Sequence, residues 1–368
     1  MRIIFRTDAS IQIGTGHVMR CLTLADALTA SGAECIFICR EHKGNLIKQI
    51  RQRGYLVMGL SADAIENTFS DLVASDKFNH YGWLGSDWTT DAVETKLGIG
   101  ESIVDWLIVD HYAIDAHWER ALRSTCRKLM VIDDLADRQH DCDLLLDQNL
   151  GRITSDYSSL VPNDCIVLAG PHFALLRPEF AEFRDYSLRR RTTSKIENLL
   201  ITMGGVDQSD ATGKILEALR GCSLPDDCEI TVIMGLDAPW LNHVNMLAVQ
   251  MPWLTKVKVN VQNMAELMSN SDLAIGAAGT TSWERCCLGL PTLIVVLAEN
   301  QIEVADSLAY NGCAKVLGTP DAVSKNLRSL LRMLTVDNEM YQMSQSARTI
   351  TDGQGVDRIK RIILGNHV

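Results

Sequence analysis

The chain has 368 residues, which exceeds the roughly 100 to 200 residues of a typical domain and favours two domains. Its formal net charge of −11 argues against nucleic-acid binding, which depends on lysine and arginine side chains that neutralise phosphates. The sequence contains no run of about 20 apolar residues and no apolar signal core behind a basic start, so we expect a cytoplasmic protein without a membrane partner.

The eleven cysteines are an odd number in a large chain. Cys35 and Cys39 alternate along an apolar run that is typical of a strand, and no CxxC pair starts a zinc site. We therefore expect buried, reduced thiols and no bound metal.

Short β-branched apolar runs alternate with longer amphipathic runs along the first half of the chain, a pattern typical of an α/β fold with parallel sheets. The expected strands are RIIFRTD (2–8), AECIFICR (33–40), DWLIVD (105–110), KLMVIDD (128–134), DLLLDQN (143–149) and CIVLAG (165–170). After the first of these, apolar residues from Val18 to Leu28 recur at helical spacing, and Ser31-Gly32 ends the helix. The segment 61–103 is irregular and receives no assignment.

A basic and polar stretch, 187–198, precedes a second α/β series. Its expected strands are NLLITMGG (198–205), EITVIMG (229–235), KVKVNV (256–261), DLAIGAAG (272–279) and PTLIVVLAEN (291–300). We predict an N-terminal Rossmann-like domain over 1–190, a C-terminal Rossmann-like domain over 191–350 and a final helix in 351–368. Because ligands of parallel α/β sheets bind outside the carboxyl ends of the strands, two such domains are expected to face one interdomain cleft.

The stretch IQIGTGH (11–17) lies where the first strand passes to the first helix. The third glycine of a dinucleotide fingerprint is missing and no acidic residue ends the next strand, which argues against a nicotinamide cofactor. Gly14 and Gly16 would let the backbone approach a ligand beside His17, although a solvent-facing histidine fits this position equally well. The positive end of a helix disfavours an imidazolium, so we expect a neutral His17 that can act as a general base.

Polar residues also follow the strand 105–110. Asp110 and Tyr112, in VDHY, stand where a strand end can line a pocket, whereas a helix cap and a packed tyrosine are the alternative. Arg6, Asp8 and Asp110 are expected to orient the histidine or the substrate, because they are near it in sequence or at a strand end. The acidic pair Asp133-Asp134 is a weaker candidate, since paired acids often cap helices.

Two glycine-rich stretches mark the second half. Gly204 and Gly205, in MGGVD, permit a close backbone approach or form a plain tight turn. The run GAAGTTSWE (276–284) has small residues and helix-start amides that suit a diphosphate, and its Glu284 suits the hydroxyls of a ribose, although an ordinary capped helix has a similar pattern. The density of small residues favours the phosphate site. Its expected contacts are Gly279, Thr280, Thr281 and Ser282.

The order of these motifs resembles that of a known family. The blocks RTDAS, IGTGH, VDHY, VIDD, GPHFALLRPEF, MGG and GAAGTTSWE…GLP…ENQ are similar to those of the UDP-2,4-diacetamido-2,4,6-trideoxy-β-L-altropyranose hydrolases of pseudaminic acid biosynthesis. The resemblance runs from the first strand to about Gln301, and its C-terminal glycine-rich block is shared with MurG-like glycosyltransferases. It implies a GT-B architecture, with UDP held mainly by the C-terminal domain and the sugar by the N-terminal one.

The resemblance also implies roles for individual residues. His17 takes the place of the catalytic base in the G-x-G-H motif, Tyr112 that of the DHY tyrosine, and Asn300, beside Gln301, that of the xNQ asparagine. Glu284 is implied at the ribose. The implied reaction is a metal-independent attack of water on the anomeric carbon, without a cofactor, which releases UDP and the free sugar for a nonulosonic acid route to flagellin glycosylation and cell-surface polysaccharides. We expect a monomer or a weak oligomer.

The chain departs from this family in its longer 61–103 segment and in Thr280-Thr281, where a serine-rich loop is typical. Three alternatives stay open. A GT-B glycosyltransferase would pass the sugar to an acceptor, although no apolar and basic docking patch points to a lipid acceptor. A non-catalytic nucleotide-sugar-binding protein would carry the same motifs without turnover. A related hydrolase would act on a differently decorated UDP or CMP sugar.

Overall fold

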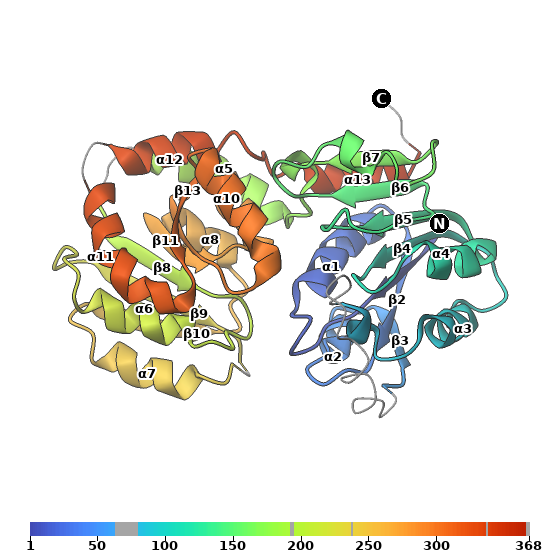
Figure 1. The fold of residues 1–368 in the computed structure, drawn as a ribbon, viewed down its shortest axis with the longest axis horizontal. Helices are drawn as coiled ribbons and strands as arrows, with labels where there is room; N and C mark the ends of the chain where they lie inside the picture. The colour runs from blue at the N-terminus through green and yellow to red at the C-terminus, as the bar shows by residue number, and fades with distance from the viewer. Residues whose placement is uncertain (63–79, 192–194, 237, 336–337, 366–368) are drawn as a thin grey trace. The chain divides into compact units, whose positions relative to one another are not determined.

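The computed structural model describes residues 1–62, 80–191, 195–236, 238–335 and 338–365, so residues 63–79 of the unassigned segment lie outside it. The chain forms two compact units, one of Met1–Leu175 with Val356–Val368 and one of Leu176–Gly355 (Figure 1). The boundary follows Leu175 and not residue 190 as expected, because the helix before residue 190 packs on helices of the second unit. The final helix belongs to the first unit and is not a separate element.

The first unit is built on a seven-stranded parallel sheet with the order β3-β2-β1-β4-β5-β6-β7. Its strands are β1 (Arg2–Thr7), β2 (Glu34–Arg40), β3 (Leu56–Leu60), β4 (Val104–Asp110), β5 (Cys126–Ile132), β6 (Leu144–Asp147) and β7 (Ile166–Ala169). Its α-helices are α1 (Gly16–Thr29), α2 (Ile47–Gln52), α3 (Trp88–Ile99), α4 (Ala116–Leu122) and α13 (Gly355–Ile363). Short 3₁₀ turns are η2 (Tyr81–Leu84), η3 (Arg123–Thr125), η4 (Thr154–Tyr157) and η5 (Pro171–Phe173). All six strands expected from the sequence are present, and β3 is additional.

Helices cover both faces of this sheet (Figure 1). Successive strand residues point to opposite faces, so Ile3 and Phe5 of β1 pack with α1, α2 and α13, whereas Ile4 packs with α3 and α4. The ring of Phe5 stacks on Phe37 of β2 with centroids 4.9 Å apart. A continuous apolar strand such as RIIF is what a sheet buried on both faces requires.

The second unit has a six-stranded parallel sheet with the order β10-β9-β8-β11-β12-β13. Its strands are β8 (Asn198–Thr202), β9 (Glu229–Met234), β10 (Leu254–Val259), β11 (Leu273–Ala277), β12 (Thr292–Val295) and β13 (Ala314–Gly318). Its helices are α5 (Pro178–Arg190), α6 (Ala211–Leu219), α7 (Leu241–Val249), α8 (Met264–Asn270), α9 (Thr281–Cys287), α10 (Ile302–Tyr310), α11 (Val323–Leu334) and α12 (Glu339–Ala347), with 3₁₀ turns η6 (Glu299–Gln301) and η7 (Pro320–Ala322). The predicted α/β class with parallel sheets is confirmed.

Each sheet has one place where the strand order reverses. In the first unit this switch point lies between β1 and β4, which pair in register from Ile3 with Trp106 to Thr7 with Asp110. In the second unit it lies between β8 and β11. Ligands of such sheets bind outside the carboxyl ends of the strands at a switch point. The IGTGH and VDHY motifs follow the first pair of strands, and the MGG and GAAG motifs follow the second.

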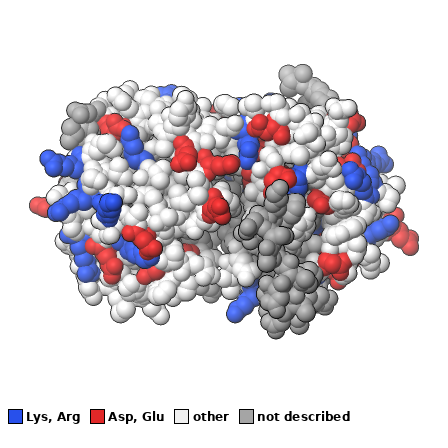
Figure 2. All heavy atoms as spheres, viewed as in Figure 1, with Lys and Arg blue, Asp and Glu red and all other residues white. Residues whose placement is uncertain are grey.

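The remaining global features concern charge, thiols and possible metal ligands. On the face that Figure 2 shows, acidic and basic side chains are interspersed. All eleven cysteines are free thiols and most are buried. Among the described residues, no group of three or more His, Cys, Asp or Glu side chains is arranged to hold a metal ion. No helix in the same residues is long and apolar enough to cross a membrane.

Candidate functional site

A histidine and an aspartate meet at the carboxyl end of the first sheet. The loop after β1 contains Gly14 with a φ of +80°, a left-handed conformation that glycine adopts without strain. The loop leads into α1, which carries His17 in its first turn. Asp110 is the last residue of β4, and its Oδ1 lies 2.6 Å from Nδ1 of His17. The alternative role of Asp110 as a helix cap is not observed, because Asp115 caps α4.

Arg20, one turn further along α1, also binds Asp110. Its Nε and Nη2 lie 2.6 and 2.7 Å from the two carboxylate oxygens of Asp110, and its Nη1 lies 2.6 Å from Asp134. Burial raises the pKa of Asp110, but the charge of Arg20 and the hydrogen bonds from Arg20 and His17 outweigh burial and hold that pKa well below its usual range. Asp110 therefore remains a carboxylate that accepts hydrogen bonds from both partners.

This pairing determines which nitrogen of His17 is free. An ionised carboxylate only accepts, so Nδ1 carries the hydrogen of a neutral ring and Nε2 keeps its lone pair. Arg20 Nη2 also approaches Nδ1, but at the longer distance of 3.3 Å, and this nitrogen already donates to Asp110. The side chain of His17 is 9% exposed, and no protein group in the described residues bonds its Nε2. The lone pair is thus available to accept a proton.

Tyr112 lies against the same histidine ring. The two rings meet edge to face, with centroids 4.5 Å apart, and the Tyr112 hydroxyl donates to Asp134 at 2.8 Å. Burial and the charge of Asp134 raise the pKa of Tyr112 well above its usual value, so the hydroxyl stays protonated. The two residues of the acidic pair after β5 therefore have different surroundings. Asp134 joins the site, whereas Asp133 accepts from the amide of Ala136 and the hydroxyl of Tyr157.

Two further aromatic rings come from the segment that the sequence left unassigned. The ring centroids of His80 and Trp83 lie 4.4 Å apart, and they lie 5.3 and 5.7 Å from that of Tyr112. Burial lowers the pKa of His80 below its usual value, so this ring is neutral near pH 7. His80, Trp83 and Tyr112 form an aromatic wall beside His17. Sequence reasoning gave no role to His80 or Trp83, because they stand in no periodic pattern.

Arg6 and Asp8 lie beneath this group and are fully buried. Arg6 forms ion pairs of 2.7 Å with Asp8 and 2.6 Å with Asp91. Oδ2 of Asp8 lies 3.3 Å from Nε2 of His111, whose Nδ1 accepts from the amide of Ala113. Both residues therefore hold the backbone of the VDHY motif in place. Arg6 and Asp8 were expected to orient the histidine or the substrate, and because both are fully buried they do not bind a substrate directly.

The second glycine-rich stretch forms a loop between β11 and α9. The backbone amides of Ala278, Gly279, Thr280 and Thr281 have no protein acceptor within the described part of the chain. An ideal Cβ placed on Gly279 meets nothing within 4 Å, so the loop borders open space. Consecutive unpaired amides of this kind bind anions. The geometry is compatible with the predicted phosphate contacts of Gly279, Thr280 and Thr281.

Ser282 and Glu284 differ in their surroundings. The Ser282 hydroxyl is buried and accepts from Nη2 of Arg285 at 3.0 Å, so it faces the interior and not a ligand as predicted. Glu284 is half-buried and has no hydrogen-bond partner among the described residues. Burial raises the pKa of Glu284 to about 7, although the charges of Arg177 and Arg285 lower it. An unpaired carboxylate at this place is available to the hydroxyls of a ligand.

The other predicted residues lie on loops of the second unit. Gly204 has a φ of +85° and borders open space. The carbonyl oxygen of Gly205 would lie 1.9 Å from a Cβ on Gly235, so the two backbones touch. Asn300 is exposed in η6, and Gln301 accepts from the amide of Leu297 at 3.0 Å, which fixes the turn. The MGG and GAAG loops therefore follow adjacent strands, whereas Gln301 has a structural bond of its own.

Two parallel-sheet units, each with its conspicuous loops at a switch point, define an α/β protein of the GT-B fold. The same fold is found in the crystal structure of MurG from Acinetobacter baumannii, with a TM-score of 0.65, 16% identity and coverage of 99% of each chain. At this level of identity the likeness shows the fold alone.

Comparison with relatives by sequence is more specific than comparison of the fold. Residues 227–359 match the Glycosyltransferase family 28 C-terminal domain. The chain is 28% identical to the UDP-2,4-diacetamido-2,4,6-trideoxy-beta-L-altropyranose hydrolase of Campylobacter jejuni, over 85% of this chain and 97% of that protein. It is 27% identical to an uncharacterized protein of Methanocaldococcus jannaschii, over 82% of this chain but only 57% of that relative. The resemblance predicted from the order of the motifs is confirmed.

Proposed function

We propose that the protein is a nucleotide-sugar hydrolase that cleaves UDP-2,4-diacetamido-2,4,6-trideoxy-β-L-altropyranose to UDP and the free sugar. The observation that carries this proposal is the His17–Asp110 pair, which leaves Nε2 of His17 unpaired at the switch point of the first sheet. A histidine held in this way by a carboxylate is the arrangement of a general base. The similarity to the Campylobacter hydrolase supports the substrate.

In the proposed reaction, Nε2 of His17 takes a proton from a water molecule while the water oxygen bonds to C1 of the sugar. The bond from C1 to the β-phosphate oxygen breaks, and its electron pair leaves with UDP. Asp110, held by Arg20, stabilises the imidazolium that forms. General-base assistance of this kind contributes about 10² to 10⁴ in rate. UDP is a stable leaving group, so the reaction requires neither a protein acid nor a metal ion.

The aromatic wall supports a place for the sugar beside His17. A trideoxy sugar with two acetamido groups presents methyl groups and apolar ring faces, which pack well on aromatic rings. The Tyr112 hydroxyl and the neutral His80 ring supply polar atoms at the same wall. We assign the diphosphate to the amides of 278–281, and the ribose to the carboxylate of Glu284. Asn300 is assigned to the active-site face by the family resemblance.

The proposal is tested with ¹⁸O-labelled water. The purified protein is incubated with the UDP-linked diacetamido sugar in the presence of EDTA, and UDP and free sugar are followed by mass spectrometry. Release of UDP with ¹⁸O in the sugar, lost in His17→Ala, is the expected result. UDP binding by the His17→Ala variant is measured in parallel, because a variant that still binds UDP separates lost catalysis from lost binding.

A glycosyltransferase of the same fold is the second candidate, and the match of residues 227–359 to a glycosyltransferase domain supports it. Such an enzyme would bind UDP tightly and release it from the UDP-sugar only when an acceptor is added. That outcome in the ¹⁸O experiment would contradict the hydrolase. Turnover of another UDP or CMP sugar in preference to the proposed one would change the substrate but not the reaction.

A further inference from the structure

Arg285 is a buried cation with few partners. It lies in α9 and is 1% exposed. Its Nη2 donates to the carbonyl of Ala277 at 2.5 Å and to the hydroxyl of Ser282 at 3.0 Å. Its Nε and Nη1 have no hydrogen-bond partner within the described residues, and both of its hydrogen bonds there go to uncharged oxygens. Burying a guanidinium without a counter-charge is unfavourable, and burial lowers the pKa of Arg285 to about 10, at which it remains charged near pH 7.

The strand β11 has a glycine where it faces the guanidinium of Arg285. An ideal Cβ on Gly276 would lie 1.8 Å from Nη1 of Arg285, so a side chain at position 276 would displace the guanidinium from its present place. Gly276 lies inside β11, where a glycine weakens a strand because it loses more conformational entropy and has no side chain to pack. The sequence thus keeps both a buried unpaired charge and a weakening glycine. Neither improves the stability of the fold, which points to a role in the site.

The two bonds of Arg285 join the two ends of the loop with unpaired amides. Ala277 precedes the loop and Ser282 follows it. The C=O of one residue and the N–H of the next point in opposite directions across a trans peptide. Because the Ala277 carbonyl is turned toward Arg285, the amide of Ala278 is turned away from it. The guanidinium therefore fixes the orientation of the first of the four unpaired amides.

We propose that Arg285 is a positioning residue for the diphosphate. From beneath the loop it holds Ala277 and Ser282, so that the amides of 278–281 stay directed at the phosphate groups, and its uncompensated charge attracts them. This inference rests on the assignment of the loop to the diphosphate under the proposed function. It adds a residue whose side chain does not touch the ligand.

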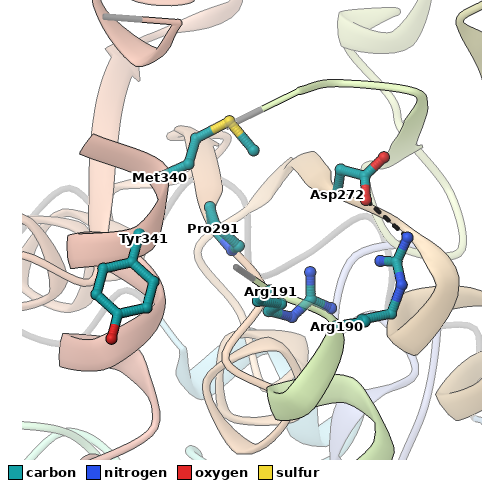
Figure 3. Close-up of a pocket in the computed structure, with 6 residues that line it drawn as sticks. All are labelled: Arg190, Arg191, Asp272, Pro291, Met340 and Tyr341. Carbon is teal, nitrogen blue, oxygen red and sulfur yellow. Dashed lines mark hydrogen bonds and ion pairs between the residues drawn. The ribbon is translucent and has the colours of Figure 1, made fainter. Parts of the chain in front are cut away.

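The second unit contains a matched control. Arg191 is also buried, and it donates to the carbonyls of Met268, Ser271 and Leu288 without a carboxylate partner in the described residues. Figure 3 shows Arg190 paired with Asp272, whereas Arg191 beside it makes no ion pair with that aspartate. Burial lowers the pKa of Arg191 to about 9. Arg191 thus matches Arg285 in burial and charge but bonds no residue of the loop.

The experiment compares the affinities for UDP and for uridine, which lacks the diphosphate. Calorimetric titrations are made on the full chain, on Arg285→Met, on Arg285→Lys and on Arg191→Met, with thermal unfolding of each. We expect Arg285→Met to lose about tenfold or more in UDP affinity, the value of one hydrogen bond to a charged group, and to keep its uridine affinity. Arg285→Lys keeps the charge, and its UDP affinity is expected to lie between those of the wild type and of Arg285→Met. Arg191→Met is expected to keep the wild-type ratio of the two affinities.

Equal losses of UDP and uridine affinity in Arg285→Met, or the same loss of UDP affinity in Arg191→Met, would show a merely structural role and overturn the inference. If Arg285→Met does not fold, Arg285→Lys decides the question. A wild-type ratio of UDP affinity to uridine affinity in Arg285→Lys, together with a wild-type dependence of UDP affinity on salt concentration, would exclude a positioning role. A wild-type protein without preference for UDP would overturn both this inference and the nucleotide assignment. A wild-type protein that prefers UDP but fails the ¹⁸O test contradicts the hydrolase alone, and the affinity ratios still decide the role of Arg285.

Discussion

Nδ1 of His17 lies 2.6 Å from Oδ1 of Asp110, although the two residues are 93 positions apart in the chain. The contact exists because β1 and β4 are neighbours in the sheet, which brings the loop after one strand to the end of the other. A side chain that only accepts hydrogen bonds thereby fixes the tautomer of the ring. The chemistry proposed for Nε2 depends on this relationship.

The first prediction concerns Asp110→Asn. The amide oxygen is expected to accept from Arg20, which leaves the NH₂ group facing His17. Nδ1 must then accept, Nε2 carries the hydrogen, and the general base is lost. We expect kcat to fall by about 10² to 10⁴ while KM changes little, as for other carboxylate-oriented histidines. Steady-state kinetics of UDP release checks this, and a wild-type kcat in a folded variant would show that Asp110 does not set the tautomer.

The second prediction concerns the aromatic wall. Trp83→Ala removes the ring that lies nearly parallel to Tyr112, at 22°, and KM for the UDP-sugar is expected to rise by about tenfold with unchanged UDP affinity. Trp83→Phe is expected to restore part of the loss. Trp88→Ala is the matched control, because Trp88 is 41% exposed and contacts the ring of His117 instead. Equal effects of Trp83→Ala and Trp88→Ala would argue against a sugar contact.

The third prediction concerns the pH dependence of stability through Glu284. Its pKa of about 7 in the folded protein exceeds the ordinary value of 4.5, so the folded state holds an additional proton between these pH values. The free energy of unfolding should therefore fall as the pH rises from 4.5 through 7, and Glu284→Gln should remove this loss. Since the side chain is partly exposed, we expect the variant to gain on the order of 1 kcal/mol above pH 7 and nothing near pH 4.

Urea unfolding of the wild type and of Glu284→Gln at several pH values between these limits measures the effect. A gain for the variant that is the same at every pH would come from packing and not from titration. The same variant should bind UDP less tightly than the wild type above pH 7, because a neutral amide accepts more weakly from the ribose hydroxyls than a carboxylate does.

The fourth prediction concerns the buried charges beneath the site. Asp91 accepts from both Arg6 and Arg40 at 2.6 and 2.7 Å, and all three side chains are fully buried. Asp91→Asn leaves two guanidinium groups short of negative charge and is expected to cost about 3 to 5 kcal/mol in the free energy of unfolding. Asp26→Asn breaks the exposed pair with Arg53 and is expected to cost at most about 1 kcal/mol. Urea unfolding compares the two, and similar costs would refute the role of burial.

Much of the fold follows from local patterns, and the exceptions have physical causes. Runs such as RIIF and LLIT are apolar throughout because both faces of a parallel sheet are buried, so their strands were predicted. β3 was missed because Leu56 and Met58 are 67% and 40% exposed and the strand contains a glycine. The domain boundary was misplaced because α5 precedes the basic stretch in sequence but packs on α8 and α9.

In the first unit, residues were proposed for the site where they followed a strand in the sequence. His17, Asp110 and Tyr112 lie in such stretches, but Arg20 lies inside a helix, where an arginine ordinarily faces solvent. Its spacing of three residues from His17 puts both on one face of α1, and this signal could have identified it. The place of Asp134 in the site could not be predicted from sequence, because its contact with Arg20 depends on the tertiary packing of α1 near the end of β5.

The position of α13 has a consequence for how the protein is made. Val356, Ile359 and Ile363 fill the core on one face of the first sheet, and the Trp106 indole of β4 donates to the carbonyl of Ile363. During synthesis, β1, β4 and the residues His17 and Asp110 leave the ribosome before the second unit, whereas α13, which covers one face of their sheet, follows that unit. The second unit is therefore completed while its predecessor still exposes an apolar face. A stop codon between the second unit and α13 would therefore leave one face of the first sheet uncovered.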